Sequence, residues 1–200
     1  IKNGDTSGPG MAQFKAIPPP MHLESLSPTR RLPPLLRCLA CMSASTPSSL
    51  PLAAFLREGQ LEASIVSTPD TVPTDTAAQA ATALGLADVS RVVKSVVFVA
   101  GDGTPLLVLA GGTDRIDTKA LEREVGCRVR LASPIEAHAA TGHVVGTIPP
   151  LCVAGCATLR VFMDEAVLAH TEPVYAGAGA PRMHLCINPE QLRAATAAKV

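Results

Sequence analysis

A lysine interrupts one of the most hydrophobic stretches of the sequence. Residues 90–100 read SRVVKSVVFVA, a run of β-branched and aromatic residues typical of a buried strand. Side chains alternate between the two faces of a strand, so Lys94 points to the same face as Val92, Val96 and Phe98. A lysine is rarely buried without a partner. Either its ammonium group reaches solvent along an apolar surface, or that face holds a group that attracts positive charge.

A loop rich in glycine and proline is the second candidate for chemistry. Gly142 and Gly146 allow the backbone of TGHVVGTIPP, residues 141–150, to approach a ligand closely, and Pro149 stiffens the exit of the loop. Such loops present backbone N–H groups that can hold an oxyanion, a carboxylate or a phosphate. A plain connection between two elements is the alternative.

Two further positions lie near the ends of predicted strands. Asp164 ends the apolar segment LRVFM, where a carboxylate either begins a turn or neutralises Lys94. Gly177 and Gly179 lie in the strand-like segment VYAGAG. Glycine in that context indicates a bulge or the close approach of another group.

Other motifs are weak or absent. Cys152 and Cys156 near His143 could bind a metal, but these three ligands in one loop match no known closed site. Cys38 and Cys41 have zinc-knuckle spacing without a second matching pair. The sequence contains no HExxH motif, no P-loop and no dinucleotide-binding fingerprint. We therefore predict neither a metal nor a cofactor.

The chain has two different compositions. Residues 1–48 combine a tag-like start with a Pro- and Ser-rich segment that lacks a hydrophobic period, and we predict a disordered leader there. The cysteines form no disulfide framework and no secretory signal is evident, which predicts a reducing compartment, the cytoplasm. Arg30, Arg31 and Arg37 leave a mitochondrial transit peptide as the alternative.

Residues 49–200 alternate helix and strand signals, which predicts one α/β domain. Asp102 and Gly103 form a tight turn between two strands, so the sheet cannot be purely parallel. We predict a mixed, mainly antiparallel sheet packed with helices. The expected strands are 63–67, 91–100, 105–110, 127–132, 158–164, 173–179 and 182–187. The expected helices are 50–58, one capped by Thr74 or Asp75 and ended by Gly85, 118–125, one capped by Ser133, and one begun by Asn188 and Pro189.

Charge and aromatic content narrow the partners. The net charge is zero and aromatic residues make up 2% of the chain, which excludes a protein that holds nucleic acid through charge or base stacking alone. No run approaches the roughly 18 apolar residues of a membrane span. Residues 49–200 contain 12 Lys and Arg against 15 Asp and Glu, so any tRNA affinity should be weak. Four arginines could contact tRNA if they gather on one face, or they are simply solvated: Arg91, Arg115, Arg128 and Arg130.

Taken in order, these segments resemble one family. TAAQAATALGL, RVVKSVVFVAGDGTPLLVLAGGTDRIDTKALEREVG, RVRLASPIEAHAATGHVVGTIPP, VFMDEAVL and VYAGAGAP are similar to the YbaK/prolyl-tRNA-synthetase-associated editing domains, from Leu52 to Val200. The most specific parts are VKS in a strand, the TGxxxGxxPP loop, MDE at a strand end and the final GAG. The resemblance implies a YbaK-like fold.

The resemblance also implies roles for individual residues. Lys94 would line the pocket and be needed for hydrolysis, and Asp164 would lie close to it. The residues implied to surround the substrate are Gly142, Gly146, Thr147, Pro149, Gly177 and Gly179.

The function that the resemblance implies is a free-standing deacylase, which removes a wrongly attached small amino acid (Cys, Ala or Ser) from tRNA(Pro) or a similar tRNA. Its partners would be the mischarged aminoacyl-tRNA and an aminoacyl-tRNA synthetase, with no membrane and no DNA. One departure stands at Leu151 and Cys152, where the family tends to have an aromatic residue and glycine. The alternative is therefore a non-catalytic module that binds tRNA or a synthetase, with the pocket closed by this segment.

Overall fold

The computed structural model describes residues 50–151 and 159–200, which belong to the second of two compact units, residues 32–200. The predicted leader 1–48 lies outside the described residues, as do the four cysteines considered as metal ligands: Cys38, Cys41, Cys152 and Cys156. The leader and the location in the cell stay predictions.

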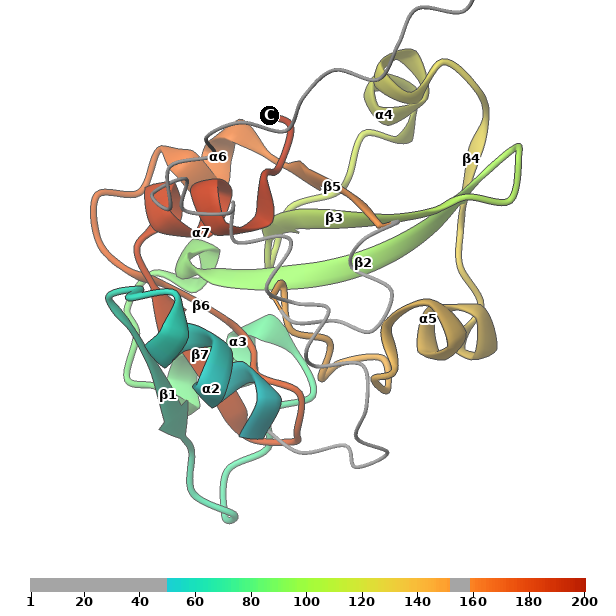
Figure 1. The fold of residues 1–200 in the computed structure, drawn as a ribbon. Coiled ribbons are helices and arrows are strands. Elements are labelled where there is room, and N and C mark those ends of the chain that lie inside the picture. Colours follow the sequence, from blue (N-terminus) through green and yellow to red (C-terminus); the bar gives the residue numbers. More distant parts are fainter. Residues whose placement is uncertain (1–49, 152–158) are drawn as a thin grey trace, which may run out of the picture. The chain divides into compact units, whose positions relative to one another are not determined.

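A seven-stranded mixed sheet forms the centre of the described part, in the order β1-β7-β6-β2-β3-β5, and β4 pairs in addition with β2 (Figure 1). The strands are β1 (Ala63–Ser67), β2 (Val92–Ala100), β3 (Pro105–Gly111), β4 (Val129–Leu131), β5 (Arg160–Met163), β6 (Val174–Gly177) and β7 (Met183–Ile187). The helices are α2 (Leu50–Glu58), α3 (Ala77–Ala83), η2 (Val89–Arg91), α4 (Thr118–Val125), α5 (Pro134–Thr141), α6 (Glu165–Leu168) and α7 (Pro189–Thr196).

The strand pairing confirms the predicted mixed sheet. Among the described strands, four pairs are antiparallel, namely β1 with β7, β6 with β7, and β2 with both β3 and β4. Two pairs, β2 with β6 and β3 with β5, are parallel. The predicted hairpin turn is present, because Asp102 accepts a hydrogen bond from the amide of Thr104 at 2.9 Å. A mixed sheet of this kind brings sequence-distant strands next to β2, which carries Lys94.

The two faces of the sheet are covered differently. Val93 and Val97 of β2 belong to the largest core cluster, which also contains side chains of α2, α5, α6 and α7. On the other face, Val92 packs with α3, and Phe98 packs with Leu121 of α4. Each fully buried side chain of this size stabilises the fold by about 1.5–3 kcal/mol. Lys94 projects from the same face of β2 as Val92 and Phe98, so it lies between the small cluster around Val92 and the one around Phe98.

Helix α3 begins two residues later than the nearer of the two predicted caps. The N-cap is Thr76, whose hydroxyl accepts from the amide of Gln79 at 3.2 Å, while the Gln79 side chain accepts from the amide of Thr76 at 3.1 Å. The prediction of Thr74 or Asp75 was therefore wrong, because only Thr76 has a residue three positions later that can complete a capping box. The short helix α6 was not predicted, since four residues carry too little periodicity.

Helix α5, which leads into the loop 142–150, begins at the predicted cap. The Ser133 hydroxyl accepts from the amide of Glu136 at 3.3 Å, and the Glu136 carboxylate accepts from the amide of Ser133 at 2.9 Å. Both Nη atoms of Arg130 donate to the same carboxylate, at 2.8 and 2.6 Å. The Arg130 hydrogen bond, followed by those of Ser133, holds the pKa of Glu136 far below its usual value.

Glu136→Gln is expected to lower the thermal unfolding midpoint at pH 7, and the difference from wild type should shrink on acidification. A carboxyl whose folded pKa is depressed contributes stability above its unfolded pKa of about 4.3, and that contribution is lost as pH falls below it. Unfolding midpoints of both proteins at pH 7 and pH 3 check this. Glu190→Gln, which removes one exposed ion pair with Arg193 on α7, is the control with little expected change. An equal difference at both pH values would contradict the assignment.

Candidate active site

Lys94 lies in β2 between two neighbours with minimal side chains. The register of β2 and β3 pairs Lys94 with Ala110. On the other side of β2, Val93 pairs with Ala176 of β6, and one residue further along both strands Gly177 aligns with Lys94. Directly paired residues project from the same face of a sheet. The lysine stem therefore has little side-chain bulk beside it within the sheet.

Asp164 lies on the same face as Lys94, two strands away. Leu109 of β3 pairs with Met163 of β5, and the amide of Asp164 donates to the carbonyl of Leu109 at 2.9 Å. Continuing this register by one residue aligns Asp164 with Ala110. Neighbouring strands are about 4.8 Å apart, so the Cα atoms of Lys94 and Asp164 are separated by about 10 Å. The sheet thus places Gly177, Lys94, Ala110 and Asp164 in one row.

The side chains of Lys94 and Asp164 do not contact each other, contrary to the hypothesis that the carboxylate holds the ammonium. Lys94 is half-buried, and its Nζ donates to the backbone carbonyl of Asp114. The Asp164 carboxylate caps α6 and accepts from the amide of Ala166 at 2.9 Å. Each of the two side chains therefore bonds to a backbone group and not to the other side chain. Within the described residues Lys94 forms no ion pair, so its positive charge is not neutralised by a carboxylate.

Two glycines, the last residue of β3 and the one that follows it, fix the segment that carries the Asp114 carbonyl. A Cβ atom on Gly111 would overlap the carboxylate of Asp114, and one on Gly112 would overlap the Cβ atom of Ala77 in α3. Only glycine fits at either position without a shift of its neighbours. This support for Lys94 was missed from the sequence, where the dipeptide GG directly after a strand was the available signal.

The loop 142–150 is shaped largely by its own hydrogen bonds. Gly142 ends α5 with φ +76° and donates to the carbonyl of His138 at 2.7 Å. The amide and the hydroxyl of Thr147 both donate to the carbonyl of Val144, at 3.0 and 2.9 Å. Pro149 is fully buried. Of the predicted loop residues, these three hold the conformation: the amides of Gly142 and Thr147 are already bonded, and Pro149 has no N–H group to donate.

Three consecutive amide groups of the same loop remain as donors. The N–H groups of Val144, Val145 and Gly146 have no hydrogen-bond partner in the described part of the chain. Gly146 has φ +92°, a left-handed conformation that favours glycine. Adjacent amides around such a residue can converge on an anion or a carbonyl oxygen. The loop therefore offers fewer donors than the sequence suggested, and they are centred on residues 144–146.

The end of β6 is in direct contact with this loop. A Cβ atom on Gly177 would lie 2.9 Å from the carbonyl oxygen of Ile148 and 3.1 Å from backbone atoms of Thr147. Gly179, with φ +91°, donates to the carbonyl of Thr147 at 2.9 Å. The prediction that these glycines allow the close approach of another group is confirmed. By the strand register Gly177 also aligns with Lys94, so this glycine connects the strand row that contains the lysine with the loop 142–150.

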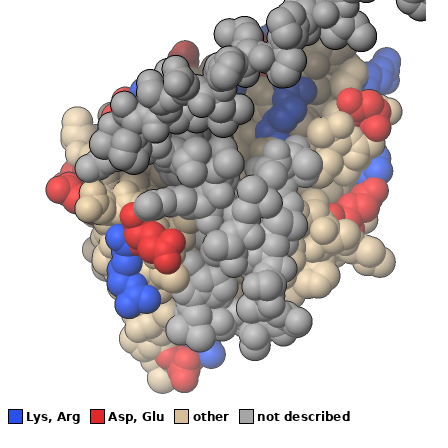
Figure 2. Space-filling model, in the orientation of Figure 1, with Lys and Arg blue, Asp and Glu red and all other residues tan. Residues whose placement is uncertain are grey.

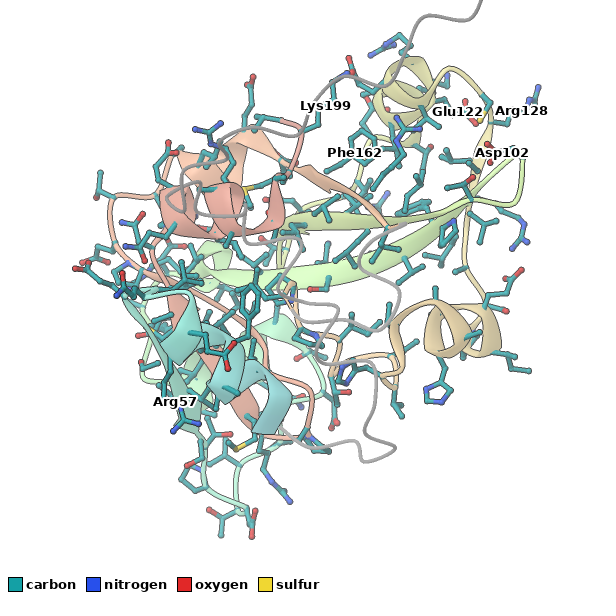
Figure 3. All side chains as sticks on the ribbon, viewed as in Figure 1. Arg57, Asp102, Glu122, Arg128, Phe162 and Lys199 are labelled. Atoms are coloured by element: carbon teal, nitrogen blue, oxygen red, sulfur yellow. The ribbon has the colours of Figure 1, made fainter. Side chains whose placement is uncertain are left out.

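Two of the four arginines considered for tRNA contact are held in ion pairs. Arg91 pairs with Glu172 at 2.5 Å and donates to the carbonyl of Pro173, and Arg130 pairs with Glu136. On the face shown in Figure 2, the visible basic and acidic side chains lie interspersed. Arg128 lies near the β2–β3 turn and Arg57 on α2, well apart in Figure 3. The described face in view therefore has no broad basic surface for a tRNA.

Metal and membrane features were also searched for among residues 50–151 and 159–200. No cluster of three or more His, Cys, Asp or Glu side chains there could hold a metal ion. No described helix is long and apolar enough to cross a membrane.

The described residues form an α/β domain with a mixed sheet, in which Lys94 makes no ion pair and the loop 142–150 packs against the end of β6. The sequence profile of the aminoacyl-tRNA editing domain family matches residues 71–195. The chain belongs to this family, as the resemblance of its motifs predicted.

Three known proteins illustrate what this chain is similar to. The uncharacterised protein YwhH of Bacillus subtilis (strain 168) is 29% identical over 125 residues, which are 62% of this chain and 77% of YwhH. A crystal structure described as a candidate trans-editing enzyme for prolyl-tRNA synthetase superimposes with a TM-score of 0.68 at 34% identity, covering 78% of this chain and 96% of that one. The hypothetical protein APE2540 has a TM-score of 0.67 at 27% identity, covering 74% and 94%.

Proposed function

We propose that this protein is a free-standing aminoacyl-tRNA deacylase that hydrolyses the ester of a mischarged small amino acid, of the Cys, Ala or Ser type, on tRNA(Pro) or a similar tRNA. The observation that carries the proposal is the position of Lys94, which makes no ion pair among the described residues and aligns with Gly177, the residue that packs against the loop 142–150. The family match and the similarity to a protein described as a trans-editing enzyme for prolyl-tRNA synthetase support it.

Lys94 supplies the positive charge that this reaction needs. The ammonium group binds the phosphate of the terminal nucleotide or the oxygen that gains negative charge during hydrolysis, in exchange for its bond to the Asp114 carbonyl. The free amides of residues 144–146 hold the aminoacyl group. Asp164 acts through α6, whose N-terminus it caps, and positions the end of β5 in the same row as Lys94.

The hydrolysis itself requires no covalent nucleophile, because an aminoacyl ester is already activated. The oxygen of a water molecule adds to the ester carbonyl carbon, assisted by the neighbouring ribose hydroxyl of the terminal adenosine. The bond from that carbon to the ribose oxygen then breaks, and the ribose oxygen takes up a proton. The products are the free amino acid and a tRNA with its 3′-terminal hydroxyl restored. Catalysis comes from positioning and charge stabilisation.

One residue of the altered segment after the double proline lies in the core. Leu151 is only 3% exposed and packs with Ile148 in the largest core cluster. Its side chain therefore belongs to the hydrophobic core. Cys152 lies outside the described residues.

A partner protein would supply tRNA selection. Residues 49–200 have three negative charges in excess, and two of the four arginines considered for tRNA contact are held in ion pairs. Binding of a polyanion by such a surface is weak. An aminoacyl-tRNA synthetase, prolyl-tRNA synthetase above all, is the partner that we propose.

A panel of tRNA(Pro) acylated with Ala, Ser, Cys or the cognate Pro tests the function. We expect the purified protein to release at least one of the three small non-cognate amino acids and to spare the prolyl ester. If none of these esters is hydrolysed, the proposed deacylase activity is contradicted and the non-catalytic binding module is favoured.

A further inference from the structure

His143 carries a ring nitrogen that no group in the described part of the chain uses. Its ring lies against Gly179, where the Cε1 atom is 3.1 Å from the position that a Cβ atom would take. Nδ1 is buried there without a hydrogen bond of good geometry. Nε2 is not enclosed, and it too has no partner among the described residues. Buried polar groups normally have partners, so the unpaired Nδ1 of His143 requires an explanation.

The position of the His143 ring favours the neutral form of the imidazole. Burial lowers the pKa of His143, and the nearby His138 adds to this, whereas the backbone of Gly179 raises it in part. Nδ1 lies 3.5 Å from the position that a Cβ atom of Gly179 would take, and we assign the ring proton to this nitrogen. Nε2 then carries a free lone pair and is a hydrogen-bond acceptor.

His143 borders the proposed active site through a short chain of contacts. Its ring touches Gly179, and the Gly179 amide donates to the carbonyl of Thr147. Backbone atoms of Thr147 in turn lie against Gly177, which aligns with Lys94. In the sequence, His143 directly precedes the three free amides of residues 144–146. The lone pair therefore lies at the edge of the region proposed to hold the aminoacyl group.

We propose that His143 determines which small amino acid is removed, by accepting a hydrogen bond at Nε2 from the side-chain hydroxyl of a seryl group. This inference rests on the proposed deacylase function. An alanyl group fills similar space but leaves the nitrogen unpaired, and the thiol of a cysteinyl group is only a weak donor. Sites built around a hydrogen bond to the substrate discriminate strongly against the analogue that lacks it. The preferred substrate class is thus a seryl ester.

The experiment compares kcat/KM for seryl- and alanyl-tRNA(Pro) in wild type, His143→Leu and His143→Gln. We expect wild type to prefer the seryl ester by about tenfold, the effect of one hydrogen bond to a half-buried acceptor. His143→Leu should bring the ratio close to one, while His143→Gln, which keeps a side-chain acceptor, should restore part of the preference. His138→Ala, at an exposed position of α5, should leave the ratio unchanged.

The two proposals fail differently in this experiment. Hydrolysis of neither ester by wild type would overturn the deacylase function itself. Hydrolysis of both without a preference for serine, or an equal loss on both in His143→Leu, would overturn only the role of His143. Thermal unfolding of each variant identifies one that does not fold. If His143→Leu does not fold, His143→Gln decides by itself, and a seryl-to-alanyl ratio of one in that variant would contradict the proposal.

Discussion

Replacing Lys94 by methionine is expected to lower kcat/KM for deacylation by about a hundredfold or more, the usual loss when one preorganised electrostatic group is removed from a site. Methionine keeps most of the apolar stem and removes the charge. The fold should be retained, because Lys94 is half-buried and its ammonium makes a single hydrogen bond to the Asp114 carbonyl. The measurements are single-turnover hydrolysis of a mischarged tRNA(Pro) and thermal unfolding.

The matched control for this variant is Lys119→Met, on the exposed surface of α4. Both variants remove one positive charge, so a general loss of tRNA attraction would affect both alike. We expect only Lys94→Met to lose hydrolysis. Wild-type rates in Lys94→Met would remove Lys94 from the mechanism, and equal losses in both variants would reduce its role to tRNA attraction.

Gly177→Ala is expected to reduce both stability and hydrolysis. The new methyl group would lie 2.9 Å from the carbonyl oxygen of Ile148, closer than real Cβ contacts allow. Either the loop 142–150 or the end of β6 must therefore shift. Overpacking of this kind costs about 1–3 kcal/mol in the free energy of unfolding. A displacement of about 1 Å in a site can cost about a hundredfold in rate. We therefore expect Gly177→Ala to remain folded while its rate of hydrolysis falls strongly.

Gly101→Ala provides the comparison for Gly177→Ala. It introduces the same methyl group at the end of the β2–β3 hairpin, where the nearest atom is 3.6 Å from the Cβ position. Denaturant unfolding and single-turnover hydrolysis of both variants check the prediction. If Gly177→Ala behaves like Gly101→Ala, the close packing of β6 against the loop has no functional role.

Local signals in the sequence were sufficient for most of the elements. Asp117, Ser133 and Asn188 each cap the helix that was predicted to follow them, because capping depends on residues within a few positions of one another. The strand order could not be obtained in this way. Strand β6 lies between β7 and β2, and its parallel pairing with β2 joins residues about 80 positions apart in the sequence. That pairing depends on the packing of the whole sheet.

The site was predictable where a residue contradicts its surroundings. Lys94 was found because a charge interrupts a hydrophobic strand, and Gly177 because glycine weakens a strand unless something approaches it. The partners of Lys94 and Asp164 were not predictable, since both side chains bond to backbone groups that tertiary structure places near them. The unpaired nitrogen of His143 likewise becomes visible only when its ring is seen against Gly179.

Nuclear magnetic resonance with a substrate analogue tests the location of the site most directly. Alanyl- and seryl-adenosine in which an amide replaces the ester cannot be hydrolysed and carry the reacting end of the tRNA. We predict that their addition shifts the signals of the Val144, Val145 and Gly146 amides, of Gly177 and Gly179, and of the Lys94 side chain, and leaves α4 and α2 unaffected. Shifts confined to other elements, with those signals unchanged, would contradict the assignment of the active site.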